Sequence, residues 1–297
     1  MNNAPRMVLL SLAAGLAAVA GPLVAQERPA PAPPVATSGP IAGPNSGPAS
    51  GLTYADLVDL AEGTPLVIRA RIKQQAQVSP ERAPGLAPGF ARLYIEADTL
   101  ALLAGNVPIG ESLRYLVDVP FDARGKLPKL KKQEVMLFAR PVPGRPREVQ
   151  LVDPRAQLAA TPELESRLRP VLAQLASADR PPVVTGVRDA LSIAGTLTGE
   201  SETQLFLDTA NDGPVSVTVV RRPGMEPRWG VSWTEIVDQA ARPPEAGTLA
   251  WYRLACGLPE QLPADANLAR DEENRARAAE DYALVMARLG PCERNRS

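Results

Sequence analysis

Histidine is absent from the sequence, which excludes a Ser-His-Asp triad, a Cys-His pair and any metal site with a histidine ligand. The two cysteines, Cys256 and Cys292, are too few for a structural zinc site made of thiolates alone. No motif in the chain supplies another metal or cofactor site. We therefore expect no metal and no cofactor.

The chain also has a net charge close to zero and few aromatic residues. The 32 basic and 33 acidic side chains leave a net charge of −1, so no overall field attracts nucleic acid or an anionic membrane. Aromatic residues are 4% of the chain, which leaves few rings to stack on bases, and no nucleic-acid partner is expected. Hydrophobic residues, at 45%, suffice for globular cores, and the length of 297 residues suggests about two domains.

The one long apolar run lies at the N-terminus. Arg6 precedes an apolar run over Met7–Ala20, which is short for a bilayer-spanning helix and typical of a signal peptide. Small residues before Gln26 favour cleavage after Ala25, and an uncleaved anchor is the alternative. The sequence thus predicts a signal peptide over 1–25, a periplasmic or secreted location, and no transmembrane span after cleavage.

Composition divides the remaining chain. Residues 26–51 are rich in proline, glycine and alanine, and they predict a disordered linker. Pro181-Pro182 follows an amphipathic segment and predicts a domain boundary. We expect a barrel domain with a trailing helix over 52–180, an α+β domain over 181–292, and a tail over 293–297.

The first of these domains contains five short predicted strands. Over Leu66–Val78 apolar residues face one way and basic residues the other. A helix over Tyr54–Ala61 is expected before the strands, and one capped by Thr161 with Pro162 at its first position after them. Such short strands between turns predict a small five-stranded OB-like β-barrel. The other strands are expected over Leu93–Leu103, Leu113–Val119, Val135–Ala139 and Val149–Val152.

The order of these strands, with a lysine-rich loop before Gln133–Phe138, resembles the OB-type barrels of netrin-like (NTR) modules in bacterial secreted proteins. In that family a G-E-x-hydrophobic-hydrophobic-F strand follows a lysine-containing turn, and Gln133 stands here in place of the glycine. The family's disulfides and the N-terminal cysteine of its protease-inhibiting members are missing from this region. The whole chain also resembles a secreted protein family of alphaproteobacteria, which implies export and supplies no activity.

The second domain is predicted to be α+β, with an antiparallel meander and C-terminal helices. Thr203–Leu207, Val215–Val220 and Arg228–Trp233 are separated by turn residues and predict three strands, and Val184–Ile193 adds another. Helices are expected after Ser232, over Thr248–Ala255 and over Asp271–Leu289. The last helix is predicted to bury one face, formed by Ala279, Tyr282, Val285, Met286 and Leu289.

The two cysteines are predicted to form a disulfide. An exported chain meets an oxidising compartment, and an isolated pair there usually bonds. Cys256 and Cys292 each lie within two residues of a glycine that ends a helix. Two free thiols, or a bond to another chain, are the alternatives.

Three groups of residues are candidates for a site. Glu200 and Glu202 lie two apart on an extended segment, which suits acid–base chemistry or cation binding, although a solvated strand edge is the simpler interpretation. Trp229 and Trp233 share a strand face beside Arg228, which suits a glycan or peptide platform, although core packing is the simpler interpretation. A basic cluster suits an anionic polymer, with a solvated loop as its alternative; it consists of Arg124, Lys126, Lys129, Lys131 and Lys132.

These patterns favour a non-enzymatic binding or interaction protein, whose partner would be an envelope protein or a glycan. A carboxylate-dependent hydrolase centred on Glu200 and Glu202 is the alternative. A protease inhibitor, by analogy with netrin-like modules, is a weaker one. The ligand and the oligomeric state are not encoded in any motif of the chain.

Overall fold

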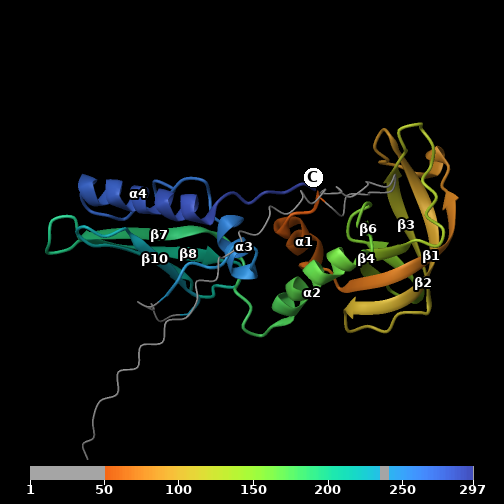
Figure 1. The fold of residues 1–297 in the computed structure, drawn as a ribbon, viewed down its shortest axis with the longest axis horizontal. Helices are drawn as coiled ribbons and strands as arrows, with labels where there is room; N and C mark the ends of the chain where they lie inside the picture. The colour runs from red at the N-terminus through yellow and green to blue at the C-terminus, as the bar shows by residue number, and fades with distance from the viewer. Residues whose placement is uncertain (1–50, 235–240, 297) are drawn as a thin grey trace, which may run out of the picture. The chain divides into compact units, whose positions relative to one another are not determined.

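The computed structural model describes residues 51–234 and 241–296. Within these ranges the chain forms four α-helices and ten β-strands (Figure 1). The helices are α1 (Tyr54–Ala61), α2 (Pro162–Ala176), α3 (Leu249–Ala255) and α4 (Glu272–Leu289). The strands of the first sheet are β1 (Leu66–Gln77), β2 (Phe90–Ala104), β3 (Ser112–Pro120), β4 (Glu134–Val142), β5 (Arg145–Leu151) and β6 (Gln157–Ala159). Those of the second sheet are β7 (Val184–Ala194), β8 (Ser201–Thr209), β9 (Ser216–Arg221) and β10 (Arg228–Ser232).

Some predicted segments lie outside the described residues. These are the signal peptide, the linker up to Ser50, and the part of the helix expected after Ser232 that falls on residues 235–240. Among the described helices, none has the length and apolar character that a membrane crossing requires.

The first sheet closes into a barrel. Its strands follow the order β1-β2-β3-β5-β4, and β1 also pairs with β4. Neighbouring strands are antiparallel except β3 and β5, which run parallel where Arg114 lies opposite Glu148. The predicted fold class, α+β with a small five-stranded OB-like barrel, is therefore confirmed. The short strand β6 pairs with β4 and has no counterpart among the predicted strands.

Strand β1 closes the barrel because it pairs along both edges. It is 12 residues long, and it faces β2 over its length and β4 over Leu66–Arg71. Register shifts, such as the one between Ile72 and Gln74, give the strand the extra twist that closure needs. The basic side chains point outward as predicted, and Arg71 pairs with Glu134 at 2.6 Å.

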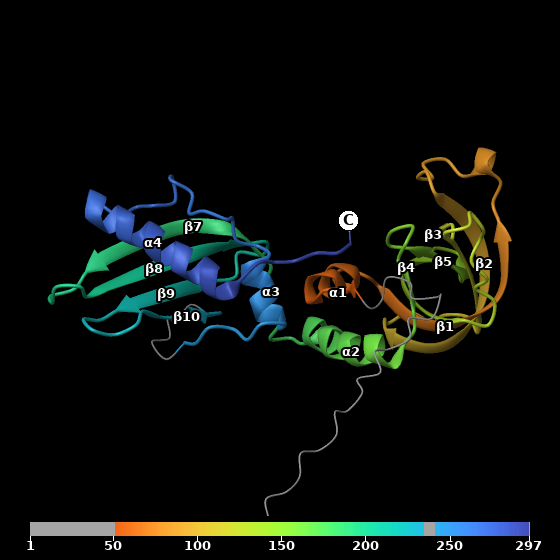
Figure 2. The same cartoon turned by 45° about the horizontal axis from the view of Figure 1, so that its top comes forward.

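Helices α1 and α2 begin at threonine caps and lie side by side (Figure 2). The hydroxyl of Thr53 accepts from the Asp56 amide at 3.1 Å, and the Asp56 carboxylate accepts from the Thr53 amide at 2.9 Å, which forms a capping box. The hydroxyl of Thr161 accepts from the Leu164 amide at 3.1 Å. The apolar faces of both helices are buried in the same hydrophobic core as the barrel.

The second sheet has the order β10-β9-β8-β7, and all its pairings are antiparallel. The predicted meander of β8, β9 and β10 is present, with β7 as a fourth strand. Helix α4 lies along one face of this sheet (Figures 1 and 2) and contacts β7 most extensively. On that face the register places Ser192 beside Thr203 and Trp229 beside Val219.

The predicted inner face of α4 needs a correction. The structure buries Ala278 and leaves Ala279 exposed, and it buries Asp281 completely. Tyr282, Val285 and Leu289 are buried as predicted, and Met286 is half-buried. The prediction was wrong at Ala279, where Ala278 is the buried alanine, and it left out Asp281 because it counted apolar residues only. The sheet instead binds the carboxylate of Asp281.

Helix α3 contributes to both hydrophobic cores. Leu249 and Tyr252 belong to the core of the barrel, whereas Leu254 and Ala255 belong to the core of the second sheet. Whether the chain folds as separate units on either side of Pro181-Pro182 stays a prediction.

Cys256 and Cys292 form the disulfide bond that the sequence predicts, with their Cα atoms 5.1 Å apart. Cys256 caps the C-terminus of α3, and Cys292 follows α4. The disulfide therefore holds Cys292, and with it the beginning of the last segment of the chain, close to α3. These residues, 293–296, are called the C-terminal tail below.

Candidate functional site

The predicted carboxylate pair lies in the hairpin between β7 and β8. An oxygen of Glu200 accepts a long hydrogen bond of 3.4 Å from the Leu197 amide of the same turn. Glu202 is exposed and accepts from the Gln204 side chain at 2.9 Å. No group of three or more metal-ligating side chains occurs among the described residues. The two glutamates thus contact their own hairpin, and the predicted acid–base role gains no support.

The two tryptophans of the predicted platform, Trp229 and Trp233, are mostly packed inside the core of the second sheet. Trp229 is 9% exposed, and Trp233 packs against the same core and is partly buried. Arg228 is exposed, because successive residues of a strand point to opposite faces. The structure therefore does not assemble Arg228 and Trp229 into one platform, and core packing is the interpretation that the burial supports.

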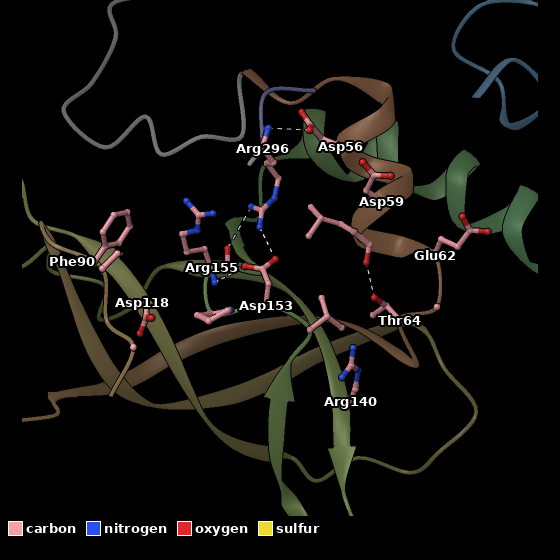
Figure 3. A pocket seen from close by; sticks show the side chains of 16 residues that line it. Asp56, Asp59, Glu62, Thr64, Phe90, Asp118, Arg140, Asp153, Arg155 and Arg296 are labelled. Atoms are coloured by element: carbon pink, nitrogen blue, oxygen red, sulfur yellow. Dashed lines mark hydrogen bonds and ion pairs between the residues drawn. The ribbon is translucent and has the colours of Figure 1, made fainter. Parts of the chain in front are cut away.

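A cavity of about 660 Å³ lies between α1 and the barrel. Figure 3 shows its walls. Helix α1 contributes Asp56 and Asp59, which lie three residues apart and so share one face of the helix, and Glu62, the residue that caps its C-terminus, also lines the cavity. The opposite wall comes from the ends of strands and from the residues that follow β5, and the C-terminal tail reaches in with Arg296. Acidic and basic side chains therefore both line this cavity.

Asp56 fastens the tail to α1. Its carboxylate accepts from the amides of Asn295 (3.1 Å) and Arg296 (3.0 Å), in addition to that of Thr53. Burial by itself would raise the pKa of Asp56, but these hydrogen bonds outweigh it and lower the pKa below 3.8. Asp56 is therefore a buried anion at neutral pH, and three backbone N–H groups satisfy it.

The other four carboxylates of the cavity also have partners. Each forms an ion pair with an arginine, and most of these arginines lie far away in the sequence. Asp59 additionally accepts from the Tyr252 hydroxyl, and burial together with this contact raises the pKa of Tyr252 to about 12. The pairs are Asp59–Arg294 (2.7 Å), Glu62–Arg253, Asp118–Arg92 (2.7 Å) and Asp153–Arg296 (2.7 Å).

The arginines that line the cavity differ from one another in their contacts. Arg296 is paired with Asp153, and Arg155 lies over the ring of Phe90 with 5.9 Å to the ring centroid. Arg140, at the far end of β4, is exposed and has no hydrogen bond or ion pair with any residue that the structure describes. Figure 3 shows it on the same side of the cavity as Thr64. The acids of the cavity therefore all have partners, whereas the guanidinium of Arg140 donates to no residue in the part of the chain that the structure describes.

Acid should release the tail from α1. The folded pKa of Asp56 lies below its unfolded value of 3.8, so its stabilising effect is complete above about pH 5 and is lost as the pH falls through the folded pKa. The Asp56→Asn variant should show the same release at neutral pH, because an amide is a weaker acceptor than a carboxylate. Hydrogen exchange at the amides of Asn295 and Arg296 measures both effects.

A matched control for this prediction is Asp265→Asn, which changes an exposed carboxylate without a hydrogen bond to a described residue. It should leave exchange in the tail unchanged. Equal protection of Asn295 and Arg296 in the Asp56→Asn variant and the unmodified protein would contradict the assigned role.

Sequence reasoning did not find this cavity. One signal was present, since Asp56 and Asp59 mark an acidic face on a helix that was predicted correctly, and Glu62 directly follows this helix. Nothing local indicated that Arg294 and Arg296, more than 230 residues away, pair with that region. The tail was predicted only as a tail, because a few polar residues after a helix carry no pattern that identifies a partner.

The fold defines the molecule as an OB-like barrel protein with a second, helix-covered sheet and a polar cavity beside the barrel. Comparison with models of known protein families finds no family that matches the chain, and comparison with curated proteins finds no match. The function must therefore be argued from the cavity and the surface.

Proposed function

We propose that this chain is an exported, non-enzymatic binding protein that holds a small carboxylate-bearing molecule in the cavity beside α1. The observation that carries the proposal is the charge pairing around the cavity. All five carboxylates there are satisfied by hydrogen bonds or ion pairs, whereas Arg140 keeps its donors free of the described residues. An anion that enters therefore meets a guanidinium and no unpaired carboxylate.

A carboxylate suits this guanidinium because the planar fork of arginine donates two parallel hydrogen bonds to it. The cavity also has apolar surface, from Leu60, Phe90 and Val152, against which the body of a ligand can pack. Its volume of about 660 Å³ falls within the usual range for small-molecule sites. These features favour an acid with a compact apolar part.

Two further observations support export and a binding role. A disulfide such as Cys256–Cys292 persists in oxidising compartments, which agrees with the predicted signal peptide over 1–25. The described residues offer no metal-ligand cluster, and the chain has no histidine, so binding is favoured over catalysis. The barrel order and the lysine-containing loop before β4 also support a proposed kinship with netrin-like OB modules. The cavity offers no observation that supports the alternative of a protease inhibitor.

Replacing Arg140 by alanine should weaken carboxylate binding. With benzoate as the probe, we expect a loss of roughly tenfold or more in affinity, because a hydrogen bond to a charged group contributes about 1.5–3 kcal/mol. Titration calorimetry of the full exported chain measures it. Inorganic phosphate serves as a second probe, which should bind more weakly because it cannot use the apolar wall.

Arg147→Ala is the matched control, since Arg147 is an exposed arginine of β5 outside the cavity without an ion pair to a described residue. It should bind benzoate as the unmodified protein does. An equal loss in both variants, or no heat of binding with either probe, would overturn the proposal.

A further inference from the structure

We propose that the outer surface of β1, β2 and β3, together with residues 121–133, binds an anionic polysaccharide. Residues 121–133, here called the basic loop, join β3 to β4. The basic loop carries five basic side chains and one carboxylate, Asp122, for a net charge of +4. All five are exposed, and none forms an ion pair with a described residue: Arg124, Lys126, Lys129, Lys131 and Lys132.

The backbone of the basic loop is fixed from two sides. Asp122 accepts from the amides of Arg124 (2.8 Å) and Lys126 (2.7 Å). Gln75 of β1 donates to the Pro128 carbonyl at 2.9 Å and accepts from the Leu130 amide at 2.6 Å. A solvated loop needs no such anchoring. Here the lysines project from a held backbone, so less entropy is lost when they bind an anion.

An apolar pair lies on the other side of β1. Tyr94 of β2 and Leu116 of β3 are direct cross-strand partners, 43% and 48% exposed. Ala76 of β1 pairs with Tyr94, and the preceding residue, Gln75, forms the two hydrogen bonds to the basic loop. Further along, the Lys132 amide donates to the Ile72 carbonyl of β1 at 2.8 Å. The lysines and the apolar pair therefore flank the same strand.

The carboxylates beside the apolar pair do not oppose an anionic ligand. Glu96 lies 3.9 Å from Arg114, and Asp118 lies 2.7 Å from Arg92. Asp98 pairs with Lys73 at 3.1 Å. Each acid on this part of β2 and β3 thus has a basic partner, and the unpaired charge of the surface is the positive charge of the basic loop.

These features favour a polysaccharide over other polyanions. One exposed tyrosine beside a leucine suits the apolar face of a sugar ring, and the lysines suit carboxylate or sulfate groups on neighbouring sugars. Single-stranded nucleic acid is usually held by several stacked aromatic side chains, and the described residues of this surface expose two, Tyr94 and Phe121, on separate elements. Insertion into an anionic membrane needs a wide continuous apolar face. Leu100 and Leu102 of β2 and Phe121 are also exposed, but along β2 the paired carboxylates Glu96 and Asp98 separate the two leucines from Tyr94.

Heparin is the test probe, with dextran as the neutral polysaccharide. The unmodified chain should bind heparin and not dextran. Lys129→Glu combined with Lys131→Glu should weaken heparin binding by roughly tenfold or more, because each lost cation also reduces counterion release. Tyr94→Ala should weaken it by about threefold to tenfold, and this loss should persist as salt is raised, because ring stacking is not screened.

The control for charge is Arg222→Glu combined with Arg270→Glu, which makes the same change at two exposed arginines of the second sheet region that lack ion pairs with described residues. It should retain heparin affinity within about twofold, since those sites lie outside the surface. Arg140→Ala should retain it as well, because the inference does not depend on the cavity. An equal loss in the control pair, an unaffected Tyr94→Ala variant, or tighter binding to oligothymidylate or to phosphatidylglycerol vesicles than to heparin would each overturn the proposal.

Discussion

Replacing Asp281 by alanine should lower the free energy of unfolding by about 3 kcal/mol, because it breaks a buried ion pair. Asp281 is fully buried on α4, lies 2.6 Å from the Arg221 guanidinium of β9, and accepts from the Thr203 hydroxyl of β8 at 2.5 Å. Removing one member of such a pair costs about 3–5 kcal/mol. We expect the low end, since the side chain of Arg221 is 21% exposed and water can reach it. Urea unfolding measures the change.

Two further variants separate charge from packing. Asp281→Asn keeps an oxygen for Thr203 and should lose about half as much, since the hydrogen bond survives and the ion pair does not. Asp281→Leu combined with Arg221→Met should recover most of the stability, because an apolar pair of similar volume needs no desolvation of charge. A loss below about 1 kcal/mol for Asp281→Ala would show that α4 does not depend on this contact.

Removing the disulfide should cost up to about 4 kcal/mol of unfolding free energy and act first at the C-terminus. Cys256 and Cys292 are separated by 36 residues, and the chain-entropy model gives about 4 kcal/mol for a loop of that size. In Cys292→Ser, hydrogen exchange should accelerate over residues 279–289 and in the C-terminal tail. The strands of the barrel should stay protected, because their pairing does not involve α4.

The single variant leaves a free thiol, so Cys256→Ser combined with Cys292→Ser is the necessary control. It should show the same loss and the same exchange pattern. Non-reducing peptide mapping of the unmodified chain should find the two cysteine peptides linked. Faster exchange spread evenly through β1 to β5 would contradict the local role of the disulfide.

The two predictions differ in how far the sequence supports them. The cysteine pairing follows from the number of cysteines and the predicted export, because a chain with two cysteines has one possible intramolecular pair and an oxidising compartment favours its formation. The burial of Asp281 does not follow from any local rule. A charged residue at that position of an amphipathic helix is normally solvated, and only the placement of Arg221 and Thr203 across the sheet makes burial favourable.

Helix ends and strand alternation were determined by the sequence alone. Helix α1 was predicted with its observed bounds, and Thr161 was predicted as the cap of α2. Helices α3 and α4 were predicted to begin at Thr248 and Asp271, which the structure shows to be their N-caps. Alternation together with turn residues located nine of the ten strands that lie in the described residues. These features depend on interactions within about four residues, which a sequence displays directly. Strand β6 was missed because three residues are too few to show a period.

The tertiary structure decided everything that depends on distant partners. It paired β1 with both β2 and β4, placed the tail against Asp56, buried Trp229 and left Arg140 beside a cavity without a partner among the described residues. None of these outcomes has a local signature, because each is a choice among many polar or apolar partners far away in the chain. The sequence by itself therefore determined the elements and the OB-like class, while the packing of those elements decided where a ligand has room and charge to bind.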